Sequence, residues 1–164
     1  MTAIARHWLW FALLAAGAML GAAHAFETFG GLSPCELCLK EREVYWLAMA
    51  LAAVGLALAR FTPLKTRRWV CAALALVFLF GAGLATYHAG AEWKFWPGPA
   101  SCSGGAMRAS AADMARLLSG ASMHAPSCDQ AAWIFLGVSM AGWNALISVG
   151  LAVSSAVAAW ARPA

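Results

Sequence analysis

The sequence predicts an all-α membrane protein, a bundle of four transmembrane helices with two long loops on the outer side of the membrane. Composition is the first observation, since 63% of the 164 residues are hydrophobic and only 11% are charged. That balance is too apolar for an ordinary soluble domain. The second observation is four apolar segments that lack acidic and basic residues, and a helix of roughly 20 such residues crosses a bilayer. The segments cover residues 8–26, 44–59, 69–90 and 139–160.

Charge placement is the third observation, and it orients these helices. The acidic residues all fall in or beside the two long intervals, about 27–42 and 91–138. At the opposite ends of the segments every charged residue is basic. These residues are Arg6, Arg60, Lys65, Arg67, Arg68 and Arg162. The positive-inside rule therefore places both termini and the short 60–68 loop in the cytoplasm, and the two long loops outside.

Two other protein classes fit the composition poorly. Buried helices of a soluble protein need polar faces, which these segments lack. The net charge of +4 does not indicate a nucleic-acid partner, because the basic residues are scattered beside apolar spans instead of forming one patch. We expect one integral membrane domain over residues 1–164.

Each element has its own signals. In the first segment, Arg6, an apolar run and Ala23-His24-Ala25 also resemble a signal peptide, but the run is long for one, and we expect a retained helix. Pro63 marks a turn between the second and third segments. Within the 91–138 loop, four apolar residues at helical spacing predict a short amphipathic helix on the membrane surface. They are Met107, Met114, Leu117 and Leu118.

The five cysteines divide by topology. Cys71 lies inside the third segment, where we expect a small apolar packing residue. The other four fall in the outward loops, on the oxidising side of the membrane. They are Cys35, Cys38, Cys102 and Cys128.

Three interpretations of the four loop cysteines remain open. Two structural disulfides are the first, but a Cys-x-x-Cys bridge closes a very small loop and gains little entropic stabilisation. A four-thiolate zinc site is the second, but the second pair is separated by 25 residues, unlike the short spacing of zinc ligands. A redox relay with two exchanging disulfides is the third, and the residues around the first pair favour it.

Pro34-Cys35-Glu36-Leu37-Cys38 is followed by Arg42, one helical turn after the second cysteine. If a helix begins at Cys38, its dipole and the Arg42 cation both favour the Cys38 thiolate, the reactive form. Arg42 as an interfacial anchor, or as a partner of Glu41 or Glu43, is the alternative. In the other loop, Trp96-Pro97-Gly98-Pro99 predicts an extended approach to Cys102, which suits docking into another protein's groove.

Taken together, these motifs resemble the bacterial disulfide-bond formation protein DsbB family, over nearly the whole chain. The matching residues are Pro34-Cys35-x-x-Cys38 with Glu41-Arg42, Tyr87-His88, Pro97-x-Pro99 before Cys102, and Cys128 with Trp133-x-Phe135-Leu136-Gly137-x-x-Met140. The resemblance implies a four-helix bundle in the bacterial inner membrane, with periplasmic loops, that acts as a thiol:quinone oxidoreductase.

The resemblance also implies roles for single residues. A periplasmic thioredoxin-fold, DsbA-like partner would attack a Cys102–Cys128 disulfide at Cys102, forming a transient mixed disulfide. Electrons would pass to Cys35 and Cys38, by way of a Cys35–Cys128 bond, and from Cys38 to a membrane quinone, either ubiquinone or menaquinone. Arg42, His88 and Met140 would lie near that quinone. His88 falls about three residues early for the family's histidine, so an interfacial anchor is its alternative role.

Related readings stay open as well. The chain could serve a dedicated partner, as a paralogue of the same family, or be a non-enzymatic membrane protein with structural disulfides. The vitamin K epoxide reductase family also places cysteines on four helices, but its Cys-x-x-Cys comes late in the bundle, whereas here it follows the first span.

Overall fold

Four long helices make up most of this computed structural model, which describes residues 3–59, 61, 63–99, 118 and 127–160. The helices and a small hairpin contain the four predicted segments, except that Ala59 is the C-cap of the second helix. They are α1 (Ala3–Thr28), α2 (Glu36–Leu58), α3 (Pro63–Glu92), β1 (Ile134–Phe135), β2 (Val138–Ser139) and α5 (Met140–Trp160). The prediction of an all-α chain with four long helices is therefore confirmed. The predicted amphipathic helix falls mostly outside the described residues.

Within the described residues, three helices are long and apolar enough to cross a membrane. These segments are His7–Thr28, Arg67–Glu92 and Met140–Trp160. The second helix does not meet the same measure, because five of its first eight residues are charged: Glu36, Lys40, Glu41, Arg42 and Glu43. Membrane crossing by the predicted segment 44–59, most of which lies in α2, therefore stays a prediction.

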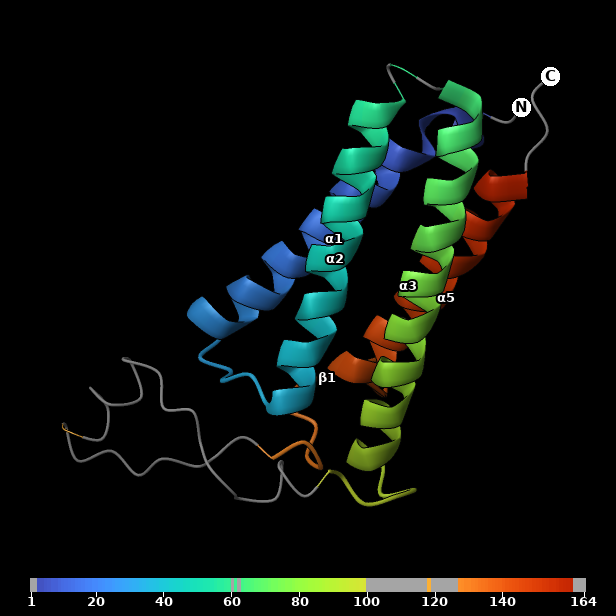
Figure 1. The fold of residues 1–164 in the computed structure, drawn as a ribbon. Coiled ribbons are helices and arrows are strands. Elements are labelled where there is room, and N and C mark those ends of the chain that lie inside the picture. The colour runs from blue at the N-terminus through green and yellow to red at the C-terminus, as the bar shows by residue number, and fades with distance from the viewer. Residues whose placement is uncertain (1–2, 60, 62, 100–117, 119–126, 161–164) are drawn as a thin grey trace.

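The helices form a bundle whose two ends differ (Figure 1). The start of α1, the end of α2, the start of α3 and the end of α5 gather at one end. The start of α2, the end of α3 and the β1–β2 hairpin gather at the other. Large apolar side chains such as Phe11, Leu79 and Phe80 point outward, as expected of a lipid-facing surface.

The interior is built largely from small residues, which let the helices approach closely. A Cβ added at Gly55 of α2 would lie 2.6 Å from Val70 Cγ1 of α3. At the same end of the bundle, the Trp8 indole of α1 donates a 2.9 Å hydrogen bond to the buried Ser155 hydroxyl of α5. Cys71 is fully buried in this core, so its expected packing role is confirmed.

The hairpin before α5 was not predicted. Its two short antiparallel strands meet at Leu136 and Gly137, which both have positive φ, of 53° and 77°. Positive φ at both central residues defines the type I′ turn, which matches the twist of a two-stranded hairpin. The hairpin carries Trp133 and Phe135, whose rings stack with centroids 5.6 Å apart, to the end of the bundle where α2 begins.

We expect Gly55→Ala to destabilise the fold and Gly83→Ala to leave it unchanged or more stable. Alanine raises helix propensity at both positions by about 1 kcal/mol. At Gly55 the new methyl also meets Val70, and overpacking of that kind costs about 1–3 kcal/mol. Nothing lies within 4 Å of the position at Gly83. Thermal unfolding followed by circular dichroism in detergent measures both; equal midpoints would contradict the close α2–α3 contact.

Candidate redox site

The start of α2 brings the two cysteines of the Cys-x-x-Cys motif together. Cys35 is the N-cap residue, with extended backbone (φ −77°, ψ 173°), and its Sγ accepts the Cys38 N–H at 3.3 Å. The two Sγ atoms lie 3.0 Å apart, and both cysteines are free thiols. The helix therefore begins at Glu36 and not at Cys38, so the capping position, where donors converge on an acceptor, belongs to Cys35.

This capping geometry changes which thiol is the more acidic. The hydrogen bonds from the Cys38 thiol and from backbone N–H groups lower the pKa of Cys35, although burial opposes them. The hydrogen bond between the Cys38 thiol and Cys35, together with burial, raises the pKa of Cys38. We expected the Cys38 thiolate to be favoured; in this reduced pair, Cys35 is the favoured thiolate, because the N-terminal donors reach its sulfur.

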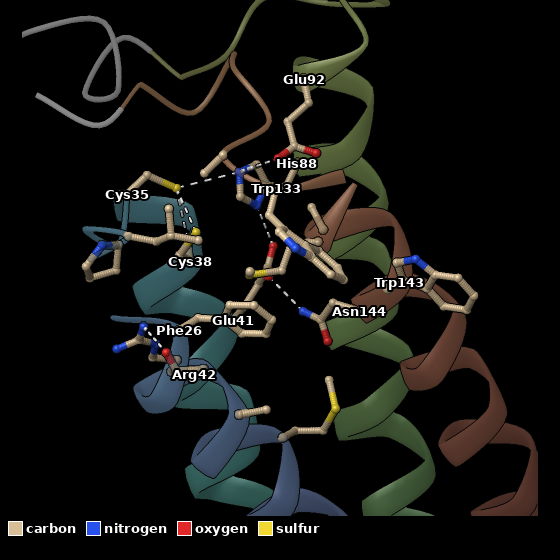
Figure 2. Close-up of a pocket in the computed structure, with 18 of the residues that line it drawn as sticks. Phe26, Cys35, Cys38, Glu41, Arg42, His88, Glu92, Trp133, Trp143 and Asn144 are labelled. Carbon is tan, nitrogen blue, oxygen red and sulfur yellow. Dashed lines mark hydrogen bonds and ion pairs between the residues drawn. The ribbon is translucent and has the colours of Figure 1, made fainter. Parts of the chain in front are cut away.

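His88 joins this pair from α3. Its Nε2 lies 3.6 Å from Cys35 Sγ, and its Nδ1 lies 2.8 Å from Glu41 Oε1 (Figure 2). A carboxylate oxygen can only accept, so Nδ1 carries a proton, and in the neutral imidazole Nε2 keeps its lone pair toward the thiol. With 4% of its surface exposed, His88 is a buried member of the site and not an interfacial anchor.

Glu41 is held in turn by α5. Its other oxygen, Oε2, accepts from Asn144 Nδ2 at 2.7 Å, and the Tyr45 hydroxyl donates to Asn144 Oδ1. Tyr45 is also 3.0 Å from the Ser148 hydroxyl. The result is a buried polar chain from Cys35 through His88, Glu41 and Asn144 to Tyr45 and Ser148. Sequence reasoning did not assign Glu41 or Asn144 to the site; the signal was a single Asn in a span without charged residues.

The Arg42 side chain bonds to α1, although we expect it from the sequence to act on the Cys38 thiolate. Its guanidinium donates to Glu27 Oε2 and, at 3.2 Å, to the Ala23 carbonyl oxygen, both on α1. Its acidic partner is therefore Glu27, and neither Glu41 nor Glu43. The charges that shift the pKa of Cys38 belong to Cys35, His88 and Glu41.

The second cysteine loop meets the first at Cys128. This residue is disulfide-bonded, 1% exposed, and packs in one buried cluster with Cys35 and Leu37. Lys94, just after α3, holds the loop by donating to the Asp129 backbone oxygen and to Oδ2, each at 2.6 Å. Three of the four predicted redox cysteines thus come together. Cys102 lies outside the described residues.

A largely apolar cavity of about 370 Å³ opens beside the two free thiols. All the residues predicted to lie near a cofactor are on its wall. They are Arg42, His88 and Met140, together with Cys35 and Cys38. The remaining wall is mainly apolar and aromatic, and includes Met19, Leu20, Phe26, Trp133, Phe135, Trp143 and Ile147.

Long apolar helices and a buried dithiol beside a disulfide-bonded cysteine define a membrane-embedded protein of thiol–disulfide exchange. Over residues 5–158 the sequence matches the family Disulfide bond formation protein DsbB, and the chain belongs to that family. It is therefore a disulfide-forming oxidoreductase and a multi-pass membrane protein. Comparisons with curated proteins and with solved structures found no match.

We expect the reduced Cys35–Cys38 pair to show one thiolate that persists below the ordinary cysteine pKa of about 8.5, because the Cys35 pKa is lowered. As pH falls, this thiolate is lost later than that of a free cysteine. Ultraviolet thiolate absorbance measures the midpoint. Cys38→Ala should raise it, since the hydrogen bond from Cys38 is the largest cause of the shift. A low midpoint that survives in Cys35→Ala would assign the thiolate to Cys38 instead.

Proposed function

We propose that this chain is a thiol:quinone oxidoreductase of the bacterial inner membrane that reoxidises a periplasmic thioredoxin-fold dithiol oxidase. One observation carries the proposal. The Cys35–Cys38 dithiol lines an apolar cavity on one side and packs against the disulfide-bonded Cys128 on the other. A dithiol so placed has a route for electrons to arrive and a space from which a lipid-soluble acceptor can take them. The orientation follows from charge: both termini lie in the cytoplasm and both long loops in the periplasm.

The second cysteine pair, Cys102 and Cys128, reacts with the thioredoxin-fold partner. We assign Cys102 as the disulfide partner of Cys128; Cys35, Cys38 and Cys71 are free, which supports that pairing. The reduced partner's thiolate attacks Cys102 and forms a mixed disulfide, and the partner's second thiolate then releases the oxidised partner. Cys102 and Cys128 keep the two electrons as thiols.

Exchange with the first pair moves these electrons inward. The Cys128 thiolate attacks the oxidised Cys35–Cys38 disulfide at Cys35, forming a Cys35–Cys128 bond and leaving Cys38 reduced. Attack by Cys102 on Cys128 then restores the outer disulfide and frees Cys35. The packing of Cys128 against Cys35 supports this route, because exchange requires the sulfurs to meet. Free thiols at positions 35 and 38 with a bonded Cys128 correspond to the product of this step.

The cavity fits a quinone head group, either ubiquinone or menaquinone. Its volume lies in the range of small-molecule sites, and such sites are mostly apolar with a few placed polar groups. Arg42, His88 and Met140 would hold the ring, with Cys38 facing it. When bound, a quinone supplies an acceptor for two electrons and two protons.

The protein's own residues handle the protons. Closing the Cys35–Cys38 disulfide releases two electrons and two protons from two thiols. His88 Nε2 takes the Cys35 proton, because it carries the free lone pair and lies 3.6 Å from that sulfur. Glu41 holds His88 in this tautomer and orientation through the 2.8 Å bond at Nδ1. Glu41 is thus a positioning residue, and His88 is the catalytic one.

An anaerobic titration tests the function. Oxidised protein in detergent with ubiquinone is mixed with a reduced thioredoxin-fold dithiol protein, and quinone absorbance is followed with free thiols. We expect one quinone consumed for each pair of thiols oxidised. No loss of quinone, with both cysteine pairs inert to the partner, would overturn the proposal.

Cys38→Ser should abolish quinone-dependent turnover, because the remaining Cys35 thiol has no neighbour with which to form the inner disulfide. The outer disulfide should still react once with a reduced partner, and acid-quenched thiol counting would record that single event. Cys71→Ser is the matched control, since Cys71 is buried in the helix core away from the site. Sustained turnover in Cys38→Ser would refute the route.

His88→Gln should slow the quinone-dependent step by about two orders of magnitude, as for loss of a general base. Glu41→Gln should slow it on the order of tenfold and alter its pH profile, since an amide does not hold the Nδ1 proton in the same way. Glu43→Gln, on an exposed position of the same helix, is the control and should match the parent. Single-turnover kinetics across pH separate the three; a uniform loss with unchanged pH profile in Glu41→Gln would indicate a structural role only.

A further inference from the structure

Two thiol sulfurs and one imidazole nitrogen converge at the redox site. The Sγ atoms of Cys35 and Cys38 and a ring nitrogen of His88 all lie within 4.8 Å of one another. Tetrahedral Zn²⁺, with bonds of about 2.3 Å to sulfur and about 2.0 Å to nitrogen, places two sulfurs roughly 3.8 Å apart and sulfur and nitrogen roughly 3.5 Å apart. The 3.6 Å from Cys35 Sγ to His88 Nε2 already fits, and the 3.0 Å between sulfurs needs to widen by less than about 1 Å.

The histidine is prepared for this role by its second contact. Metal-binding histidines commonly donate their other N–H to a carboxylate, which fixes the tautomer and raises the basicity of the ligand nitrogen. Glu41 Oε1 takes the Nδ1 proton of His88 at 2.8 Å, so Nε2 faces the two sulfurs with its lone pair. Asn144 fixes Glu41 in turn, at 2.7 Å.

A fourth donor lies one helical turn from the histidine. Glu92 Oε1 is 3.9 Å from His88 Nε2, and only 5% of the Glu92 side chain is exposed. Its Oε2 is buried and has no hydrogen-bond partner within the described part of the chain. Figure 2 shows Glu92 and His88 on the same face of α3, directed toward the cysteines. A buried carboxylate oxygen without a partner is costly, and a cation would satisfy it.

From these contacts we propose that the reduced protein binds one Zn²⁺ through Cys35, Cys38 and His88, with Glu92 at the fourth position. Thiolate and imidazole ligands select Zn²⁺ over Mg²⁺ and Ca²⁺, which prefer oxygen. Binding displaces the two thiol protons and adds a 2+ charge to two thiolates. The oxidised pair has no thiolates, so the site exists in the reduced state alone.

Redox-gated binding has a consequence for the chemistry of the pair. Sulfur held by Zn²⁺ cannot close into a disulfide, so the metal arrests the protein with its electrons on the inner pair. This inhibition rests on the proposed function, whereas metal binding itself does not. The two can therefore fail separately.

The experiment uses full-length protein in detergent, freed of metal and reduced under anaerobic conditions, titrated with Zn²⁺ against a chromophoric chelator. We expect one ion per chain in reduced protein and none in oxidised protein. Co²⁺ as a spectroscopic probe should give the intense visible absorption of a tetrahedral site and sulfur-to-cobalt charge transfer. Binding of equal strength by oxidised protein, or no binding above a detergent blank, would overturn the proposal.

Variants locate the ion. Cys38→Ser and His88→Ala should weaken Zn²⁺ binding strongly, and Glu92→Gln and Glu41→Gln by about 10- to 100-fold. Cys71→Ala should bind as the parent does. In a Cys102→Ser/Cys128→Ser background one ion should still bind; its loss there would assign the metal to a four-thiolate site and refute the one proposed. If Zn²⁺ binds without loss of turnover, the proposed inhibition is refuted and the proposed metal site stands.

Discussion

The buried carboxylate of Glu41 is the constraint on which the rest of the site depends. About half of the residues in the interior of this bundle are alanine or cysteine, which pack closely but specify helix register weakly. Glu41 is 8% exposed, and a buried carboxylate is stable only with partners. It has two such partners, His88 on α3 and Asn144 on α5. Those two bonds fix α3 and α5 relative to α2, and they fix His88 relative to Cys35.

Cys35 is where the three parts of the site meet. As the N-cap of α2 it receives the Cys38 N–H, it faces His88 Nε2, and it packs against Cys128. In the relay proposed above, electrons from the second loop and protons passing to α3 therefore use the same sulfur. Arg42 takes no part in that junction; its bonds to Glu27 and Ala23 tie α2 to α1 and close the other side of the cavity. The buried His88–Glu41 pair and the Arg42 cation therefore have separate hydrogen-bond partners on the cavity wall.

Sequence reasoning reached the elements and the reactive pair but not the contacts between them. Segment composition was enough to predict four helices, and the Cys-x-x-Cys spacing was enough to predict a redox pair, because both are local properties. The partner of Arg42 lies 15 residues away and the partners of Glu41 lie 47 and 103 residues away. Such pairings depend on which faces meet. The β1–β2 hairpin was missed because its strands have two residues each and its turn uses Leu136, which rarely adopts positive φ.

Counted back from Pro97, His88 lies about three residues earlier than the histidine of the DsbB family. The end of α3 explains why His88 can still belong to the site. The helix runs on to Glu92, so His88 and Glu92 lie one turn apart on a single face. Past that end, Lys94 has positive φ and the chain turns back. Trp96 then lies over Gly90, where an added Cβ would fall 2.0 Å from the indole, and its Nε1 donates to the Tyr87 carbonyl at 2.8 Å. The residues between His88 and Pro97 are therefore used to fold the chain back on the helix. Counting along the sequence overstates how far Pro97 lies from His88, and the glycine at position 90 is what permits that return.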